Sequence, residues 1–169
     1  MKIDDHGGFE ASLHNIKRSS MWPATRKAHL KREPKCIACP VDIQPPLWRR
    51  MLFLGHAVEV HHIIPFHICV ILGRRDLETD SRNLVTLCRD KRYQHHLLLG
   101  HLENYGSYCL PVRRFVASMF RGMTEQQILD DSRWQTLLKS RPKAIQMMDS
   151  QELSTLAEHL DELMPKVRV

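Results

Sequence analysis

Histidine and cysteine are the residues of this sequence whose types and spacing could do chemistry. The 169 residues include 11 His and 5 Cys, among them the pair Cys36-x-x-Cys39 and the adjacent histidines His61 and His62. Thiolate and imidazole are ligands that Zn²⁺ prefers in proteins. A neutral imidazole near its ordinary pKa is also a suitable general base at pH 7. The sequence therefore points to metal binding, to proton transfer, or to both.

Each of these features has an ordinary explanation when it is taken by itself. A Cys-x-x-Cys pair is a redox pair or two inert thiols in a turn, and a His-His pair in a strand is more often accidental than catalytic. Asn83, between a loop and a strand, is by default a turn residue. Their order along the chain is more specific: a cysteine pair, a segment ending in His-His, then Asn83 and a segment leading to further histidines.

Short strands are predicted on both sides of the loop that separates His62 from Asn83. Residues 57–65 are rich in β-branched residues and predict a strand that Pro65 ends. Residues 84–88 predict a second strand, residues 67–80 a loop, and a helix is expected to begin at His95. Because neighbouring strand residues point to opposite faces, His61 and His62 should not face the same way.

Helices are predicted before and after these strands, so the expected fold class is α+β. A helix should begin near Ser19 and end near Glu33, because the residue before a proline avoids the helical region. Thr124 to Gln127 and Asp149 to Glu152 both fit capping boxes. The first predicts a helix to about Lys139, and the second an amphipathic C-terminal helix.

The order of these segments resembles that of the HNH endonucleases. The matching segments are EVHHIIPF (59–66), NLVTLC (83–88) and HHLLLGH (95–101), after a lead-in over 18–39 that is similar to small stand-alone members with a zinc knuckle. The resemblance implies a ββα-metal (His-Me finger) core, in which a divalent cation lies between a β-hairpin and a helix. It implies a zinc knuckle beside that core.

The resemblance covers residues 18–109, and it divides the chain into three parts. We expect a flexible N-terminus over 1–17, an HNH nuclease domain over 18–109 and a helical extension over 110–169. The N-terminal helix and the C-terminal extension would flank this core.

The resemblance also implies roles for individual residues. His62 would be the general base that deprotonates water, and His61 and His96 would bind the catalytic cation, Mg²⁺, Mn²⁺ or Ni²⁺. Asn83 would orient the hairpin, or His62 itself, through hydrogen bonds. The expected catalytic residues are thus His62, Asn83, His61 and His96.

Two further residues near this expected cation have roles that the sequence leaves open. His101 follows His96 by five positions, about 140° around an ideal α-helix. It joins the cation only if Gly100 ends or distorts the helix. Glu59 points to the same strand face as His61, so it is either a carboxylate that supports a metal-bound histidine or an ordinary exposed residue.

A second, structural metal is expected, because Zn²⁺ in structural sites takes four ligands in a closed tetrahedron. The expected ligands are Cys36, Cys39, Cys88 and His95. Here the chain departs from related sequences, which often place a second Cys pair at this point. Cys69 and Cys109 compete for the fourth position, and a degraded, empty site is the remaining alternative.

The net charge of +6 is unevenly distributed and suggests a polyanionic partner. Basic residues dominate residues 17–50, whereas acidic ones dominate 124–164. A solvated face of a basic protein explains the same pattern. As DNA-binding residues we expect Arg26, Lys27, Lys31, Arg32, Arg49 and Arg50. Trp48 could contact the DNA backbone as well, or it could pack in the core with Phe53.

The expected function is a metal-dependent DNA endonuclease with salt-sensitive binding and weak sequence discrimination. The alternatives are a non-catalytic zinc-knuckle module and an interaction protein in which residues 110–169 dock a partner or pair two copies. No apolar run is long enough to span a membrane. A bacterial or phage-encoded cytoplasmic protein is the expected setting, with a secreted toxin as the alternative.

Overall fold

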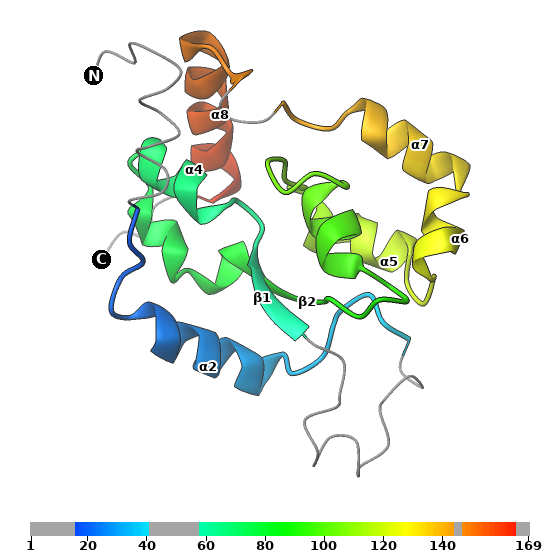
Figure 1. The fold of residues 1–169 in the computed structure, drawn as a ribbon. Coiled ribbons are helices and arrows are strands. Elements are labelled where there is room, and N and C mark those ends of the chain that lie inside the picture. Colours follow the sequence, from blue (N-terminus) through cyan, green and yellow to red (C-terminus); the bar gives the residue numbers. More distant parts are fainter. Residues whose placement is uncertain (1–15, 41–57, 144–146, 165–169) are drawn as a thin grey trace.

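A two-stranded antiparallel hairpin lies among the helices of this chain (Figure 1). The computed structural model describes residues 16–40, 58–143 and 147–164. Strand β1 (Val58–His62) pairs with strand β2 (Leu84–Cys88), which places His61 opposite Val85 and His62 opposite Leu84. The second strand has its predicted bounds, whereas the first was predicted over 57–65 and ends earlier, at His62. The described chain is therefore α+β, as the sequence indicates.

The register of the hairpin separates the two adjacent histidines. Directly opposed residues of an antiparallel pair share a face, so His61 lies with Val85 and His62 with Leu84 on opposite faces. The face of His62 meets helix α2 (Trp22–Arg32), where the rings of His62 and Trp22 lie 4.5 Å apart. The face of His61 meets the helix that follows β2.

Helix α2 has the bounds that its prolines predict. Pro23 occupies the first turn, and the helix ends at Arg32, with Glu33 as its C-cap before Pro34. Glu33 then joins the helix to β2, since its carboxylate accepts a hydrogen bond from the Thr86 amide at 2.6 Å and its carbonyl accepts one from the Thr86 hydroxyl at 2.7 Å.

The connection between the strands is helical, so the predicted loop over 67–80 is wrong. It contains helix α4 (Phe66–Ile71) and two short 3₁₀ turns at Arg75–Glu78 and Ser81–Asn83. Helix α4 has no side-chain cap, but Ile68 is fully buried. Tertiary packing, which local pattern does not report, therefore stabilises this helix.

The helix expected from His95 is a π-helix, η3 (His96–Gly100). A second π-helix, η4 (Val112–Val116), leads into helix α5 (Ala117–Met119). Hydrogen bonds from each residue to the fifth along widen such a turn, and π-turns are frequent at functional sites. The C-terminal end of η3 carries Gly100, the residue that the sequence marked as a point of distortion.

The capping boxes begin helices where they were predicted. Helix α6 (Glu125–Leu129) starts after Thr124, and helix α8 (Ser150–Leu163) starts after Asp149. The single helix expected to Lys139 is instead two helices, because Asp131 caps a new one, α7 (Ser132–Lys139). Within the described ranges, no helix combines the length and the apolar character that a membrane span requires.

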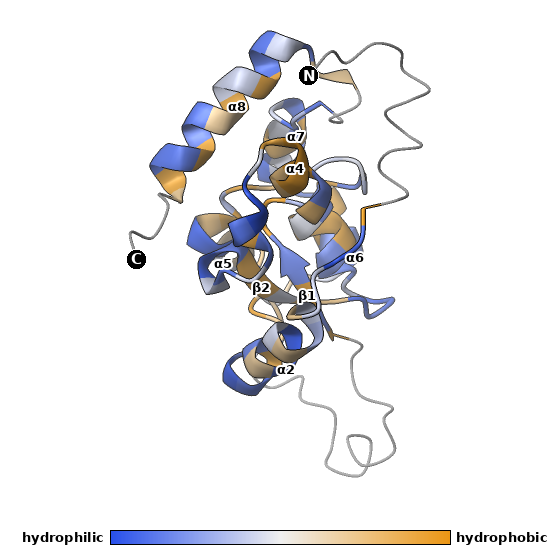
Figure 2. Cartoon of the chain, turned by 90° about the vertical axis from the view of Figure 1, so that its left-hand side faces the viewer, coloured by the Kyte–Doolittle hydropathy of each residue, from blue (hydrophilic) through white to orange (hydrophobic). Residues whose placement is uncertain are grey.

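Two groups of buried apolar side chains hold these elements together. One joins the hairpin and η3 to η4, α5, α6 and α7, with Leu87 and Leu98 packed among residues such as Phe120 and Trp134. The other joins α4 to α8, which presents Leu156 and Leu160. Helix α8 is amphipathic in Figure 2. Residues on both sides of the expected boundary at 109 thus share a core.

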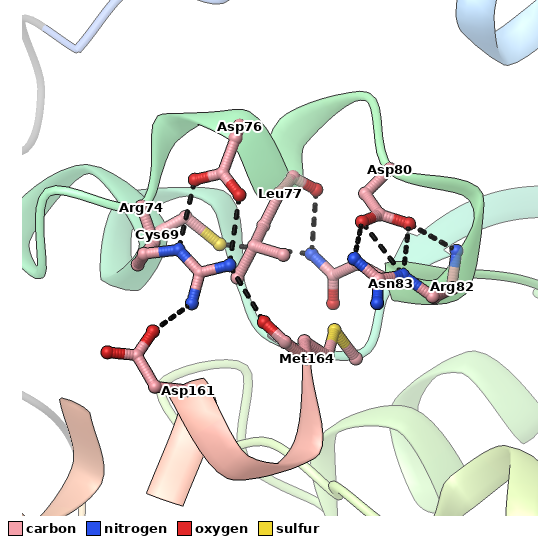
Figure 3. A network of polar contacts seen from close by, with 9 residues as sticks. All are labelled: Cys69, Arg74, Asp76, Leu77, Asp80, Arg82, Asn83, Asp161 and Met164. Atoms are coloured by element: carbon pink, nitrogen blue, oxygen red, sulfur yellow. Dashed lines mark hydrogen bonds and ion pairs between the residues drawn. The ribbon is translucent and has the colours of Figure 1, made fainter. Parts of the chain in front are cut away.

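A buried arginine fastens the end of α8 to the connection between the strands (Figure 3). Arg74 is 3% exposed. Its guanidinium donates to both carboxylate oxygens of Asp76 at 3.0 and 2.9 Å, to the Asp161 carboxylate and to the Met164 carbonyl at 2.8 Å. The apolar contacts of α8 are therefore reinforced by one cation that bridges two distant segments.

We expect Arg74→Met to lower the free energy of unfolding by about 1–3 kcal/mol, because the buried Met164 carbonyl loses its charged donor. Asp161→Asn should cost less than about 1 kcal/mol, since that carboxylate is 61% exposed. Urea unfolding of both variants beside the wild type measures the difference. Equal unfolding midpoints for Arg74→Met and the wild type would contradict a stabilising role for the guanidinium.

Candidate metal centres

Four predicted zinc ligands, Cys36, Cys39, Cys88 and His95, converge in the structure and could hold a metal ion. Their ligand atoms all lie within 4.8 Å of one another. The Nδ1 atom of His95 is 3.3, 3.7 and 3.5 Å from the sulfurs of Cys36, Cys39 and Cys88. The sulfurs of Cys39 and Cys88 are 3.6 Å apart. Cys69 and Cys109 are not members of this group.

These separations fit a tetrahedral zinc ion. Bonds of about 2.3 Å to sulfur and about 2.05 Å to nitrogen give tetrahedron edges of about 3.8 Å between sulfurs and about 3.6 Å between sulfur and nitrogen. The His95 ring is oriented for this role, because its Nε2–H donates to the Met123 carbonyl at 3.2 Å. That bond leaves Nδ1 as the lone-pair atom facing the sulfurs.

The cysteines reach this position through backbone contacts between the knuckle and the hairpin. The Cys39 amide donates to the Cys36 carbonyl at 3.3 Å, which closes a tight turn. The Ile37 amide within that turn donates to the Thr86 carbonyl at 3.1 Å. Because Thr86 lies two residues before Cys88 on β2, the pairing aligns the knuckle with the third sulfur.

Without a cation, the negative charge of this Cys3His group is shared unequally among its sulfurs. Hydrogen bonds from the neighbouring thiols lower the pKa of Cys36 and raise that of Cys39, because one sulfur carries the negative charge and the others donate to it. Burial opposes the charged form of His95, but the Cys36 and Cys88 sulfurs raise its pKa to about 10. A divalent cation would replace these protons and let all three thiols ionise.

His61, His96 and His101 form a second group that could hold a metal ion. His61 comes from β1, His96 begins the π-helix η3, and His101 follows its last residue. The ring centroids of His61 lie 5.1 Å from His96 and 4.7 Å from His101, and those of His96 and His101 are 4.9 Å apart. The rings stand nearly perpendicular to one another, at 82–85°. Three nearly equidistant imidazoles of this kind match a single central ion.

The π-turn explains how His101, five residues after His96, joins the same histidine group. In an α-helix His101 would lie far around from His96, whereas the wider π-turn returns the fifth residue toward the same face. Gly100 permits this approach. A Cβ atom added to Gly100 would lie 3.0 Å from both Cε1 and Nε2 of His61.

In each imidazole of the histidine group, one nitrogen makes no hydrogen bond and is available to coordinate a cation. Nε2 of His61 and Nδ1 of His96 are buried without a hydrogen-bond partner. Nδ1–H of His101 donates to the Ser107 carbonyl at 2.9 Å, which leaves Nε2 as its lone-pair atom. Burial lowers the pKa of all three imidazoles, that of His96 to about 4, so each is neutral and able to coordinate at pH 7.

Glu59 lies beside this histidine group and contacts His96. Its Oε2 is 3.6 Å from Nε2 of His96, and its Oε1 accepts a hydrogen bond from Arg89 at 2.8 Å. A carboxylate on the far nitrogen of a metal-bound imidazole favours the tautomer whose other nitrogen is free to coordinate. Of the two roles that the sequence left open, the geometry favours the supporting carboxylate.

His62 has a different environment on the opposite face of β1. Its Nε2–H donates to the Glu78 carbonyl at 2.9 Å, so Nδ1 is the unprotonated nitrogen. Burial lowers the pKa of His62 to about 4; the Glu78 carbonyl opposes this shift and the cation of Arg18 adds to it. The imidazole is therefore neutral at pH 7, which is the form that a general base requires.

Asn83 orients the hairpin rather than His62. Its side-chain oxygen accepts from the Ile64 amide at 2.7 Å, and its amide donates to the carbonyls of Ile64 at 3.2 Å and Leu77 at 3.0 Å. These bonds join the segment after β1 to the turn before β2. Asn83 thus holds His61 and His62 in place through the backbone.

The expected DNA-binding residues fall into two sets. The first is exposed on α2 and consists of Arg26, Lys27, Lys31 and Arg32. Arg49 and Arg50, together with Trp48, lie outside the described residues.

The sequence did not predict the backbone carbonyls that orient the imidazoles, which belong to Glu78, Ser107 and Met123. No sequence pattern marks them, because they are backbone groups; those of Glu78 and Met123 also lie 16 and 28 residues from the imidazoles that they orient.

Zinc should remain bound at the Cys36, Cys39, Cys88 and His95 group through dialysis. In a His61→Ala background, which removes a ligand of the other group, we expect one zinc per chain. Adding Cys36→Ser should release it and destabilise the fold, because metal binding is coupled to folding. Cys69→Ser is the matched control and should keep its zinc. Elemental analysis with thermal unfolding reports both effects; loss of zinc in the control alone would mean that the ligands are misassigned.

Gly100→Ala should weaken cation binding at the histidine group at least about tenfold, because the new methyl group displaces the His61 ring from its position. Calorimetric titration of Ni²⁺ into zinc-loaded protein measures this affinity. The zinc content of the same preparation serves as the control and should not change. Wild-type affinity for Ni²⁺ in Gly100→Ala would refute the close packing of Gly100 against the coordinating ring.

Comparison of the chain with protein-family models, with curated proteins and with solved structures finds no match. A functional assignment therefore depends on the residues and geometry of this chain. Three features of the structure bear on the function. They are the group of Cys36, Cys39, Cys88 and His95 (the thiolate group), the group of His61, His96 and His101 (the histidine group), and the neutral imidazole of His62 with its oriented lone pair.

Proposed function

We propose that this protein is a metal-dependent endonuclease of the HNH type that hydrolyses DNA phosphodiester bonds. One observation carries the proposal. At the end of β1, His61 belongs to a set of three neutral imidazoles that fits a cation, and His62 is an imidazole whose lone pair is fixed by a backbone carbonyl. Phosphodiester hydrolysis needs these two components, a cation at the phosphate and a base for water.

In the proposed mechanism Nδ1 of His62 accepts a proton from the attacking water. The Glu78 carbonyl keeps the other nitrogen protonated, so the ring cannot present the wrong tautomer. The histidine group would hold the cation, which when bound supplies charge stabilisation at the non-bridging and leaving oxygens of the phosphate. Since His61 and His62 are consecutive and face opposite sides, the phosphodiester would lie across the end of β1 to reach both.

The donor atoms favour some cations over others. The histidine group contributes three neutral nitrogens, which suit Ni²⁺ and Zn²⁺, whereas Mg²⁺ prefers oxygen ligands. Among the cations expected from the sequence, Ni²⁺ therefore matches this set best and Mg²⁺ least. The thiolate group would take no part in the chemistry, because its four ligands complete a closed zinc site.

DNA would approach along the face that carries α2. The exposed cations of this helix, Arg26, Lys27, Lys31 and Arg32, would contact the phosphate backbone. Such contacts give affinity that falls with salt and little base discrimination. Helix α2 also carries Trp22 against His62, so DNA bound on this face would lie beside the proposed base.

Plasmid cleavage by zinc-loaded protein tests the proposal. With Ni²⁺ or Mn²⁺ present, we expect cleavage by the wild type and a decrease of about 10²–10⁴-fold in His62→Ala, as is usual for loss of a general base. The matched control is His159→Ala, an exposed histidine of α8, which should retain wild-type activity.

Two results would contradict the nuclease. Folded, zinc-loaded wild type that leaves all DNA and RNA intact would favour a binding module that lacks catalysis. Equal cleavage by wild type and His62→Ala, with zinc content unchanged, would exclude His62 as the base. Removing the added cation should abolish cleavage while leaving the tightly bound zinc in place.

A further inference from the structure

The segment before α2 is held against the side of the site that carries His62. The backbone amide of Ser19 donates to both carboxylate oxygens of Glu78, at 3.0 and 3.2 Å. The carbonyl of Lys17 accepts from Arg75 at 2.6 Å. Both neighbours of Arg18 are therefore anchored to the turn that contains Glu78, and the direction of the Arg18 backbone is determined.

The Arg18 side chain lies on two aromatic rings that also contact His62. Its guanidinium carbon is 4.4 Å from the centre of the Trp22 ring and 4.9 Å from that of Phe66. The same rings lie 4.5 and 6.4 Å from the His62 ring. A cation over aromatic faces is held by the ring quadrupoles without losing its hydrogen-bond donors.

The donors of this guanidinium have no carboxylate acceptor in the described part of the chain. The carboxylate of Glu78 contributes a favourable charge, but its two oxygens accept from the Ser19 amide. Arg18 itself is exposed. A planar, exposed guanidinium beside a catalytic imidazole is suited to bidentate contact with a phosphate.

We infer that Arg18 binds a phosphate of the DNA strand next to His62 and that Glu78 is the positioning residue that places it there. The inference rests on the proposed nuclease function and adds a substrate contact that the charge pattern did not single out. Glu78 acts on both partners, since its carbonyl fixes the tautomer of His62 and its carboxylate fixes the backbone of Arg18. One residue thus aligns the base with the phosphate.

Binding of a labelled DNA duplex tests the inference separately from cleavage. The measurement uses full-length, zinc-loaded protein carrying His62→Ala, without added cation, over a series of salt concentrations. We expect Arg18→Gln to weaken binding about tenfold or more, as for loss of a charged hydrogen bond. It should also reduce the slope of log affinity against log salt by about 0.9, which corresponds to one phosphate contact. Arg18→Lys should recover the slope, because it restores the charge.

Arg121→Gln is the matched control, since it removes an equal charge from the exposed turn between α5 and α6. It should leave affinity and slope nearly unchanged. Glu78→Gln should weaken binding while keeping the backbone carbonyl that contacts His62. An unchanged slope in Arg18→Gln, or an equal loss in Arg121→Gln, would overturn the inference. DNA that is bound with the expected slopes but never cut by the His62-containing protein would instead reject the nuclease and keep Arg18 as a phosphate contact.

Discussion

The hydrogen bonds of Asn83 are the constraint on which the candidate site depends. The fully buried side-chain amide of Asn83 bonds to both backbone groups of Ile64 and to the Leu77 carbonyl. The backbone carbonyl of Asn83 accepts from the Ile63 amide at 2.9 Å. Together these bonds fix the register of β1 against β2. A slip of one residue would exchange the faces of His61 and His62 and separate each from its partners.

The two candidate metal centres are connected through consecutive residues. His95 belongs to the thiolate group. The next residue, His96, belongs to the histidine group and begins the π-helix η3. Zinc would therefore hold the first turn of η3 against the knuckle and β2. Since coordination tolerates displacements of only a few tenths of an ångström, a disordered zinc site would disturb the second centre as well.

The elements beyond residue 109 contribute to this arrangement through packing. Trp134 and Ile128 complete the core that supports η3, and the carbonyl of Met123 orients His95. Helix α8 covers the other side, where Arg74 binds its C-terminal end. The helical extension thus supports the candidate site, and the docking role that the sequence also suggested for it stays a prediction.

The sequence by itself determined both strands, the capped helix starts and the residues able to bind metal or carry protons. These depend on local propensity, on caps within one turn and on residue type. The tertiary structure alone decided that His101 joins His96, that residues 66–71 form a helix, and which nitrogen of each imidazole is free. Those outcomes depend on packing and on carbonyls such as those of Glu78 and Met123, which reach the site from distant segments. Spacing along a chain does not encode such contacts, because they exist only after the elements have packed.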